Sequence, residues 1–141
     1  MSKEWKARNP NYFFVLFGEK HASAHPVEGG VYPDRKGWKR ISNLGMAPGD
    51  VLLLYCGGKY PGHKKEAPGV GVVIDIETDD GVETIDYQFL PLDQAIPWNP
   101  IIKGLPAVTA HQPLRYIGNW VFQLSSASFS MALVGRQIKW P

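Results

Sequence analysis

The apolar residues of this chain fall into short runs separated by glycine, proline and acidic turns, a pattern typical of a small β-rich protein. Two runs, YFFVLF at 12–17 and VLLLY at 51–55, are uninterrupted and predict buried strands. A third run, GVGVVIDIET at 69–78, changes from wholly apolar to alternating apolar and acidic. The runs at 82–90 and 119–124 bring the number of predicted strands to five.

Turn residues separate these strands. Pro48-Gly49-Asp50 predicts the turn before the second strand, and residues 57–68, GGKYPGHKKEAP, predict a flexible basic loop after it. Asp79-Asp80-Gly81 predicts a hairpin, because Asp-Gly supplies the positive φ of a tight turn. The returning strand would then have an apolar face made by Glu83, Ile85, Tyr87 and Phe89. Several prolines exclude a long element in the stretch that follows: Pro97, Pro100, Pro106 and Pro113.

Two segments have helical spacing. Residues 35–44 predict a short basic helix, with an apolar side made by Trp38, Ile41 and Leu44. Ser125 or Ser126 is expected to cap a C-terminal helix. Its inward residues would be Phe129, Leu133 and Val134. Together these elements predict an α+β fold, a strongly bent mixed or antiparallel sheet of five or six strands that forms an open barrel with short flanking helices.

Length and composition indicate one globular domain. The chain has 141 residues, of which 44% are hydrophobic and 20% charged. We expect residues 1–10 to be a flexible tail and residues 11–141 to form the domain. The single cysteine excludes an internal disulfide, and no apolar run approaches the roughly 20 residues that span a bilayer. With no secretion signal recognisable, we expect a cytoplasmic protein without membrane contact.

Charge is unevenly distributed along the chain, although the net charge is only +2. The segment 35–65 is basic, with Arg35, Lys36, Lys39, Arg40, Lys59, Lys64 and Lys65. The segment 75–93 is acidic, with Asp75, Glu77, Asp79, Asp80, Glu83, Asp86 and Asp93. These segments would either make a polarised surface that attracts a polyanion to one side, or be ordinary solvated surface.

Cysteine and histidine chemistry is the first candidate for a site. Cys56 ends a predicted strand, and His21, His25 and His63 could supply a base or, with Cys56, zinc ligands. No spacing enforces either arrangement, so the sequence favours a small buried Cys56 without a metal site. The acidic segment lacks the spacing of a calcium loop, and the glycines at 69–71 lack the Lys-Ser/Thr ending of a phosphate loop.

Tryptophans are a stronger indication of function. The chain has five of them: Trp5, Trp38, Trp98, Trp120 and Trp140. Trp38 and Trp98 have basic, polar or proline neighbours, unlike the tryptophan of an apolar strand. An aromatic wall beside basic residues is what a flipped or single-stranded base requires, because the base stacks on it while phosphates meet lysine and arginine. The alternative is that these tryptophans belong to the core.

The order of the motifs resembles the EVE domain family of the PUA-like superfamily, whose relatives are the YTH and ASCH domains. The resemblance runs from Tyr12 to Glu77, through a first strand, a basic helix, the stretch MAPGDVLLLY at 46–55, a loop, and GVGVV at 69–73. Two departures concern the site. Cys56-Gly57-Gly58 stands where the family has His-Ser or similar residues, and 30–35, GVYPDR, replaces a Trp-Asp-Gly-Val-Arg-Asn stretch.

The resemblance implies a PUA-like pseudo-barrel with a pocket beside the second predicted strand that receives one base of RNA or DNA, in some cases a modified one. Tyr55, Trp38 and Trp98 would form the aromatic wall. The backbone of Cys56, Gly57 and Gly58 would contact the base edge. The seven basic residues of the segment 35–65 would hold phosphates. No cofactor or catalytic residue is expected; the alternatives are a small-molecule or protein-interaction module, and a nucleotide-acting enzyme that uses Cys56.

Overall fold

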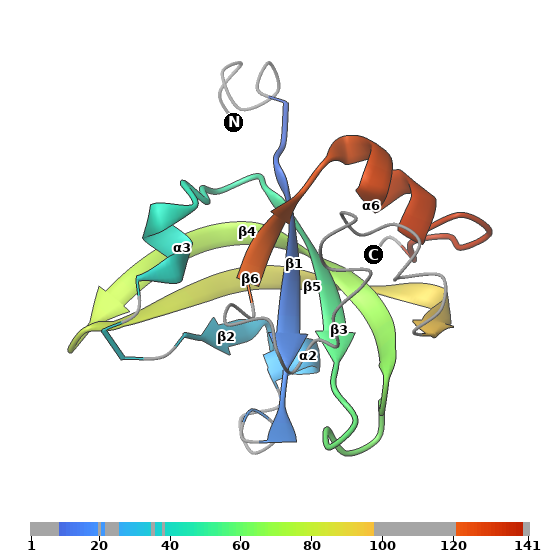
Figure 1. The fold of residues 1–141 in the computed structure, drawn as a ribbon, viewed down its shortest axis with the longest axis horizontal. Helices are drawn as coiled ribbons and strands as arrows, with labels where there is room; N and C mark the ends of the chain where they lie inside the picture. The colour runs from blue at the N-terminus through green and yellow to red at the C-terminus, as the bar shows by residue number, and fades with distance from the viewer. Residues whose placement is uncertain are drawn as a thin grey trace.

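The computed structural model describes residues 9–19, 21, 26–34, 36–37, 39–97 and 121–139. Figure 1 shows one bent sheet with short helices around it. Six strands form the sheet: β1 (Tyr12–Phe17), β2 (Val31–Pro33), β3 (Val51–Cys56), β4 (Glu66–Asp79), β5 (Val82–Pro97) and β6 (Val121–Leu124). Among the described residues, three short helices accompany them: α2 (Pro26–Gly29), α3 (Arg40–Asn43) and α6 (Ser126–Ala132). The predicted α+β class is confirmed.

The strand order is β2-β5-β4-β3-β1-β6, and β1 and β3 are parallel while every other neighbouring pair is antiparallel. The predicted hairpin between β4 and β5 is confirmed, and both Asp80 and Gly81 have positive φ at its turn. No helix in the described part of the chain has the length and apolar character needed to cross a membrane.

Asp50 explains why the turn before β3 is built from Pro-Gly-Asp. Its buried carboxylate accepts hydrogen bonds from the backbone N–H of Asn11 at 3.1 Å and of Ala47 at 2.9 Å. The Val51 N–H donates in turn to the Asn11 carbonyl at 3.0 Å. One side chain therefore closes the turn and aligns the start of β1 with the start of β3.

Alternate residues of the strands pack into two hydrophobic clusters on opposite faces of the sheet. Leu52, Leu54 and Cys56 of β3 belong to one, here called the barrel cluster, with residues of α2, β2 and α3. Leu53 and Tyr55 belong to the other, here called the α6 cluster, because Phe129 and Ala132 of α6 complete it. Even-numbered residues of β3 therefore pack in the barrel cluster, and Leu53 and Tyr55 pack in the α6 cluster.

Several predicted boundaries are wrong. Residues 66–68 are the start of β4, not loop, and β5 continues through Pro91 to Pro97. A register shift between Ala67 and Gly69 accompanies this extension, and proline is tolerated at such irregularities because one ladder donor is dispensable there. Only three residues long, β2 has no repeating pattern to predict it.

Both helices are shorter than predicted. The segment 35–44 becomes helical only at Arg40, because Gly37 and Lys39 have positive φ, at 81° and 52°. Ser125 is confirmed as the cap of α6, since its hydroxyl accepts from the Ser128 N–H at 3.0 Å. Val134 was expected to face inward but is 70% exposed, because α6 ends at Ala132.

Candidate functional site

The ends of β1 and β3 lie together at one end of the barrel. The two strands are parallel and in register, so Phe17 at the end of β1 is paired with Cys56 at the end of β3. Figure 1 shows that α2 and the connection from β3 to β4 lie at the same end. The predicted base-reading segment 56–58 is therefore placed beside the end of β1, and we call this region the barrel end.

Four rings gather at the barrel end, and we call Phe17, His21, Tyr32 and Tyr60 the aromatic cluster. The Tyr32 ring stacks on His21 at 5.0 Å between centroids and meets Phe17 edge-on at 4.9 Å. Tyr60, from the β3–β4 loop, meets Phe17 edge-on at 6.3 Å. Each of the four side chains is at most 5% exposed. The rings are thus packed against one another, and Tyr60 brings the β3–β4 loop into contact with Phe17.

The polar atoms of this cluster are hydrogen-bonded. The Tyr32 hydroxyl donates to the Leu16 carbonyl at 3.1 Å, and the Gly18 N–H donates to His21 Nδ1 at 2.9 Å. Below them, the Tyr87 hydroxyl donates to the Pro26 carbonyl and so ties α2 to β5. Burial raises the pKa of the Tyr32 and Tyr87 phenols far above the ordinary value. Both therefore stay neutral donors at physiological pH.

Cys56 is a buried thiol at the centre of the barrel end. Burial raises its pKa to about 12, and the negative charges of Glu66 and Glu28 add to that shift. Because the thiolate is the nucleophile, a thiol with so high a pKa is inert near pH 7. His21 is engaged with Gly18, and His25 lies outside the described residues. This arrangement disfavours the enzyme hypothesis that rests on Cys56.

The backbone next to Cys56 is largely committed to the fold. The Gly57 N–H donates to the Phe17 carbonyl at 2.9 Å, and the Gly57 carbonyl accepts from the Tyr60 N–H at 3.1 Å. Gly58 is exposed, and a Cβ there would lie 3.2 Å from Cε of Lys65, whose stem crosses it. Of the three residues predicted to read a base edge, Cys56 is buried, Gly57 is partly exposed and Gly58 is exposed.

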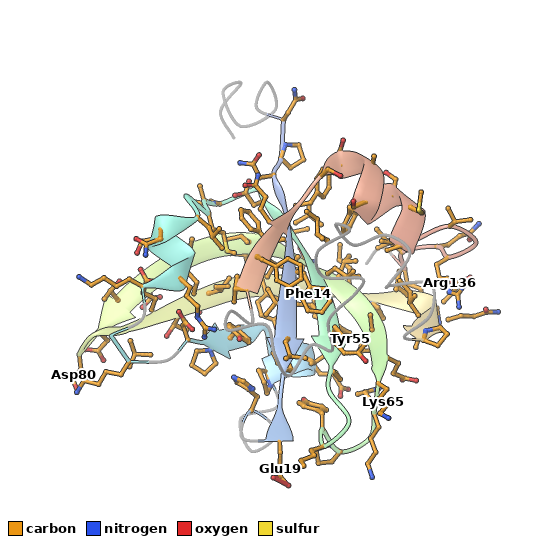
Figure 2. The ribbon with its side chains drawn as sticks, in the orientation of Figure 1. Phe14, Glu19, Tyr55, Lys65, Asp80 and Arg136 are labelled. Carbon is orange, nitrogen blue, oxygen red and sulfur yellow. The ribbon has the colours of Figure 1, made fainter. Side chains whose placement is uncertain are left out.

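Tyr55 lies on the other face of the sheet. It is 3% exposed, and its ring lies 5.6 Å from that of Phe14 in the α6 cluster (Figure 2). Burial raises the pKa of its phenol to about 12. Tyr55 is therefore separated from the aromatic cluster by the thickness of β3. Trp38 and Trp98, its predicted partners in an aromatic wall, lie outside the described residues, as do the other three tryptophans.

The basic residues form two separate groups. Lys36 pairs with Asp80 at the hairpin tip at 3.3 Å, whereas Lys65 lies far from Asp80 in the β3–β4 loop (Figure 2). The first group contains Lys36, Lys39 and Arg40, while Arg35 lies outside the described residues. The second contains Lys59, Lys64 and Lys65, all exposed. The described basic residues of the segment 35–65 therefore do not form one continuous surface.

Arg40 differs from the other basic residues because its guanidinium is buried. The side chain is 7% exposed and forms an ion pair with Asp34, which is also buried. Its Nε donates to Asp34 Oδ1 at 2.9 Å. Lys39, the residue before it, is exposed. The buried Arg40 guanidinium is therefore not placed to reach phosphates, contrary to expectation.

The acidic segment is mostly exposed strand surface, as expected, with one exception. Glu83 is 4% exposed, and its carboxylate accepts from the backbone N–H groups of Ile41 at 3.1 Å and Ser42 at 3.2 Å. It thereby caps the start of α3. This role could not be predicted from the sequence, because Glu83 and α3 are about forty residues apart. Asp75, Glu77 and Asp86 bring one carboxylate oxygen each within 4.8 Å of the others on the solvent side. Such exposed acidic groups are common without a bound ion.

Comparison with known proteins rests on the fold. No family model matches the chain, and no curated protein matches it in sequence. The crystal structure of Atu2648 from Agrobacterium tumefaciens matches with a TM-score of 0.59 at 13% identity, over 89% of this chain and 92% of the other. The NMR structure of Rpa0253 from Rhodopseudomonas palustris matches with a TM-score of 0.56 at 16% identity, over 86% and 90%.

A third similar structure contains a bound ligand. The crystal structure of the Pho92 YTH domain in complex with m6A matches with a TM-score of 0.58 at 11% identity, over 87% of this chain and 80% of that domain. The fold is YTH-like. Solved structures thus share the fold of this chain, and identities this low do not transfer the roles of individual residues.

Proposed function

We propose that the chain is a nucleic-acid-binding domain of the EVE type that captures a single base, modified or unmodified, at the barrel end. The observation that carries this proposal is the YTH-like fold, shared over 87% of the chain with a domain solved in complex with m6A. Because a fold does not by itself determine a function, the local chemistry has to supply the rest.

The barrel end has the groups that base capture needs. A base requires a ring to stack on, and the aromatic cluster offers Phe17 once the Tyr60 ring is displaced. The exposed Gly58 allows a close approach to the backbone. The exposed Lys59, Lys64 and Lys65 of the same loop would hold phosphates, which fixes position rather than sequence. Trp38 and Trp98 remain our candidates for further aromatic contacts.

The direct test is binding of single-stranded oligonucleotides, RNA and DNA, with and without one m6A, followed by fluorescence anisotropy at two salt concentrations. We expect affinity to fall steeply with salt, because phosphate contacts release counterions. We also expect the affinity to change with the m6A modification only when the modified base is the one that is captured. Absence of binding to every oligonucleotide at low salt would refute the proposal.

Two buried tyrosines on opposite sides of the sheet, Tyr60 of the β3–β4 loop and Tyr55 of β3, provide a matched pair of variants. Tyr60→Ala uncovers the Phe17 ring that is proposed to stack on the base, so it should raise oligonucleotide affinity, by at most the roughly ten- to a hundredfold that a base–aromatic contact contributes. Replacing Tyr55 should instead lower stability by about 3–5 kcal/mol, as truncation of a buried aromatic does, and leave affinity of the folded fraction intact. Melting and binding are measured on the same samples, and a loss of affinity confined to Tyr55→Ala would move the site to the other face.

A small-molecule or protein-interaction module is the second candidate. It is favoured by the carboxylates of Glu28 and Glu66, which lie close enough to Cys56 to raise its pKa and would repel phosphates from part of the barrel end. Binding of an uncharged ligand with no dependence on salt would support this alternative. Loss of binding at high salt would exclude it for that ligand.

A further inference from the structure

Lys65, the last residue of the β3–β4 loop (residues 57–65), has an unusual backbone conformation. Its φ is 58°, in the left-handed region that residues other than glycine adopt only with strain. Among the described residues, Lys39 and Asp80 are the other side chains found there. Glycine occupies the remaining positions with positive φ: Gly30, Gly37, Gly45, Gly49, Gly62, Gly81 and Gly135. Glycine at 65 would remove the strain but also the ammonium group, which makes this lysine side chain a candidate for function.

Pairing on both branches of the loop fixes where this side chain begins. Cys56 of β3 pairs with Glu66 of β4, so Lys65 lies immediately before a paired residue. On the opposite branch, the Gly57 N–H donates to the Phe17 carbonyl at 2.9 Å. The backbone of Lys65 is therefore held across the loop from Gly57, at the barrel end.

The stem of Lys65 lies across Gly58. A Cβ built on Gly58 would lie 3.2 Å from Cε of Lys65 and 3.7 Å from its Cγ, so the stem runs close over this glycine. Packing along the stem restricts the rotamers of a lysine and leaves its ammonium group in solvent. Lys65 is exposed, and no carboxylate of a described residue forms an ion pair with it. Its charge is therefore available to an anion beside Gly58.

We propose that Lys65 fixes the phosphate that flanks the captured base, and that the site therefore takes a nucleotide within a strand rather than a free nucleoside. The inference rests on the proposed function, in which the base approaches the backbone at Gly58. Base and phosphate of one nucleotide are joined through a single sugar, so a cation held over Gly58 lies on the path of that phosphate. Lys59 and Lys64 contribute charge to the strand as a whole.

Lys65→Gly removes the ammonium group and the strained φ together, so its melting temperature should be at least that of wild type. Binding is measured by fluorescence anisotropy, with whichever RNA or DNA oligonucleotide of the direct test binds most tightly. We expect affinity to fall about five- to tenfold and the slope of log affinity against log salt to flatten by about one unit, as loss of one phosphate contact requires.

Lys39→Gly is the matched control, because Lys39 is an exposed lysine with a φ of 52° that lies instead at the start of α3. It removes the same charge and the same strain, and should change affinity by at most about twofold, as should Lys64→Gln. Losses in these variants equal to that of Lys65→Gly would show that only the number of charges matters, and would overturn the inference.

Gly58→Ala tests the contact between Gly58 and the lysine stem. Gly58 is not among the glycines with positive φ, and its added methyl group would displace the stem of Lys65. We expect Gly58→Ala to weaken binding about two- to fivefold when Lys65 is present, and by less when it is made in Lys65→Gly, since coupled residues are not additive. Equal losses in both backgrounds would show that Gly58 does not position Lys65, which would contradict the inference.

Neutral methylphosphonate linkages, introduced into the oligonucleotide one at a time, identify the phosphate. The linkage beside the captured base should weaken binding to wild type about five- to tenfold and have little effect on Lys65→Gly, where this contact is already lost. Similar small losses at every linkage would overturn the inference and leave the proposed function in place. Absence of binding by every oligonucleotide would overturn both.

Discussion

Two stretches of the chain, residues 34–42 and 57–66, have similar numbers of basic side chains and use them in opposite ways. In the first, Arg40 is buried against Asp34 and Lys36 is paired with Asp80. In the second, the three lysines point into solvent from a loop rich in glycine and proline. The difference arises from the acidic β4–β5 hairpin, which packs on the first stretch only. Charge counted along a sequence therefore overstates the surface that a polyanion can reach.

The largest effect that would sharpen this contrast is expected for Arg40→Ala. Removing one partner of a buried ion pair leaves Asp34 as an uncompensated buried charge, which costs about 3–5 kcal/mol. Denaturant unfolding monitored by circular dichroism measures this loss. A variant with unchanged stability but weakened oligonucleotide binding would show instead that Arg40 belongs to the binding surface.

Glu83→Ala is expected to have the next largest effect. It leaves the N–H groups of Ile41 and Ser42 without their acceptor, and unsatisfied buried donors cost about 1–3 kcal/mol. The same unfolding experiment measures it, with Glu77→Ala, a fully exposed carboxylate on the same hairpin, as the control. If both variants are equally stable, α3 does not depend on this cap.

In the second stretch, the double variant Lys64→Glu/Lys65→Glu should weaken oligonucleotide binding on the order of tenfold, nearly independently of sequence. Each lysine that contacts a phosphate contributes about one unit to the slope of log affinity against log salt, so the slope should flatten accordingly. Anisotropy titrations over a range of salt concentrations give both quantities. Unchanged affinity and slope would place the phosphates elsewhere.

The smallest effect is expected for Lys36→Ala. Its pair with Asp80 is exposed on both sides, and such pairs contribute about 0–1 kcal/mol. We expect a change in melting temperature near the error of the measurement and no change in oligonucleotide affinity. Weakened binding in this variant would return the first stretch to the binding surface and remove the contrast between the two.

The fold was predictable from sequence where its signals are local. β1, β3 and the hairpin turn follow from apolar runs and from an Asp-Gly pair, which need only near neighbours. The short β2 and the late start of α3 depend instead on contacts with β5, through paired residues such as Tyr32 and Ile85 and through the Glu83 cap. No pattern within either segment contains that information.

The end of β3 at Cys56 was predictable from sequence, whereas the side chains that gather around it were not. The glycines after Cys56 correctly indicated an end of the barrel, and the parallel register of β1 and β3 explains why. Tyr55 and Cys56 are adjacent in an extended strand, so their side chains point to opposite faces. Both residues were expected to line one site. The alternation of side chains along a strand, which could be read from the sequence, argued against that expectation. Tyr60 lacked any periodic context and was found only through its ring contact with Phe17.

The pairing of β1 also has a consequence expected for the order of folding. Tyr12 of β1 lies opposite Leu124 of β6, so one edge of β1 stays unpaired until residue 124 has been synthesised. The β4–β5 hairpin, in contrast, pairs residues that are close in sequence and can form early. Until β6 arrives, β1 presents an apolar edge that other chains can join. Nascent chains that stop before residue 121 are therefore expected to aggregate or to require a chaperone, while chains that include β6 are not.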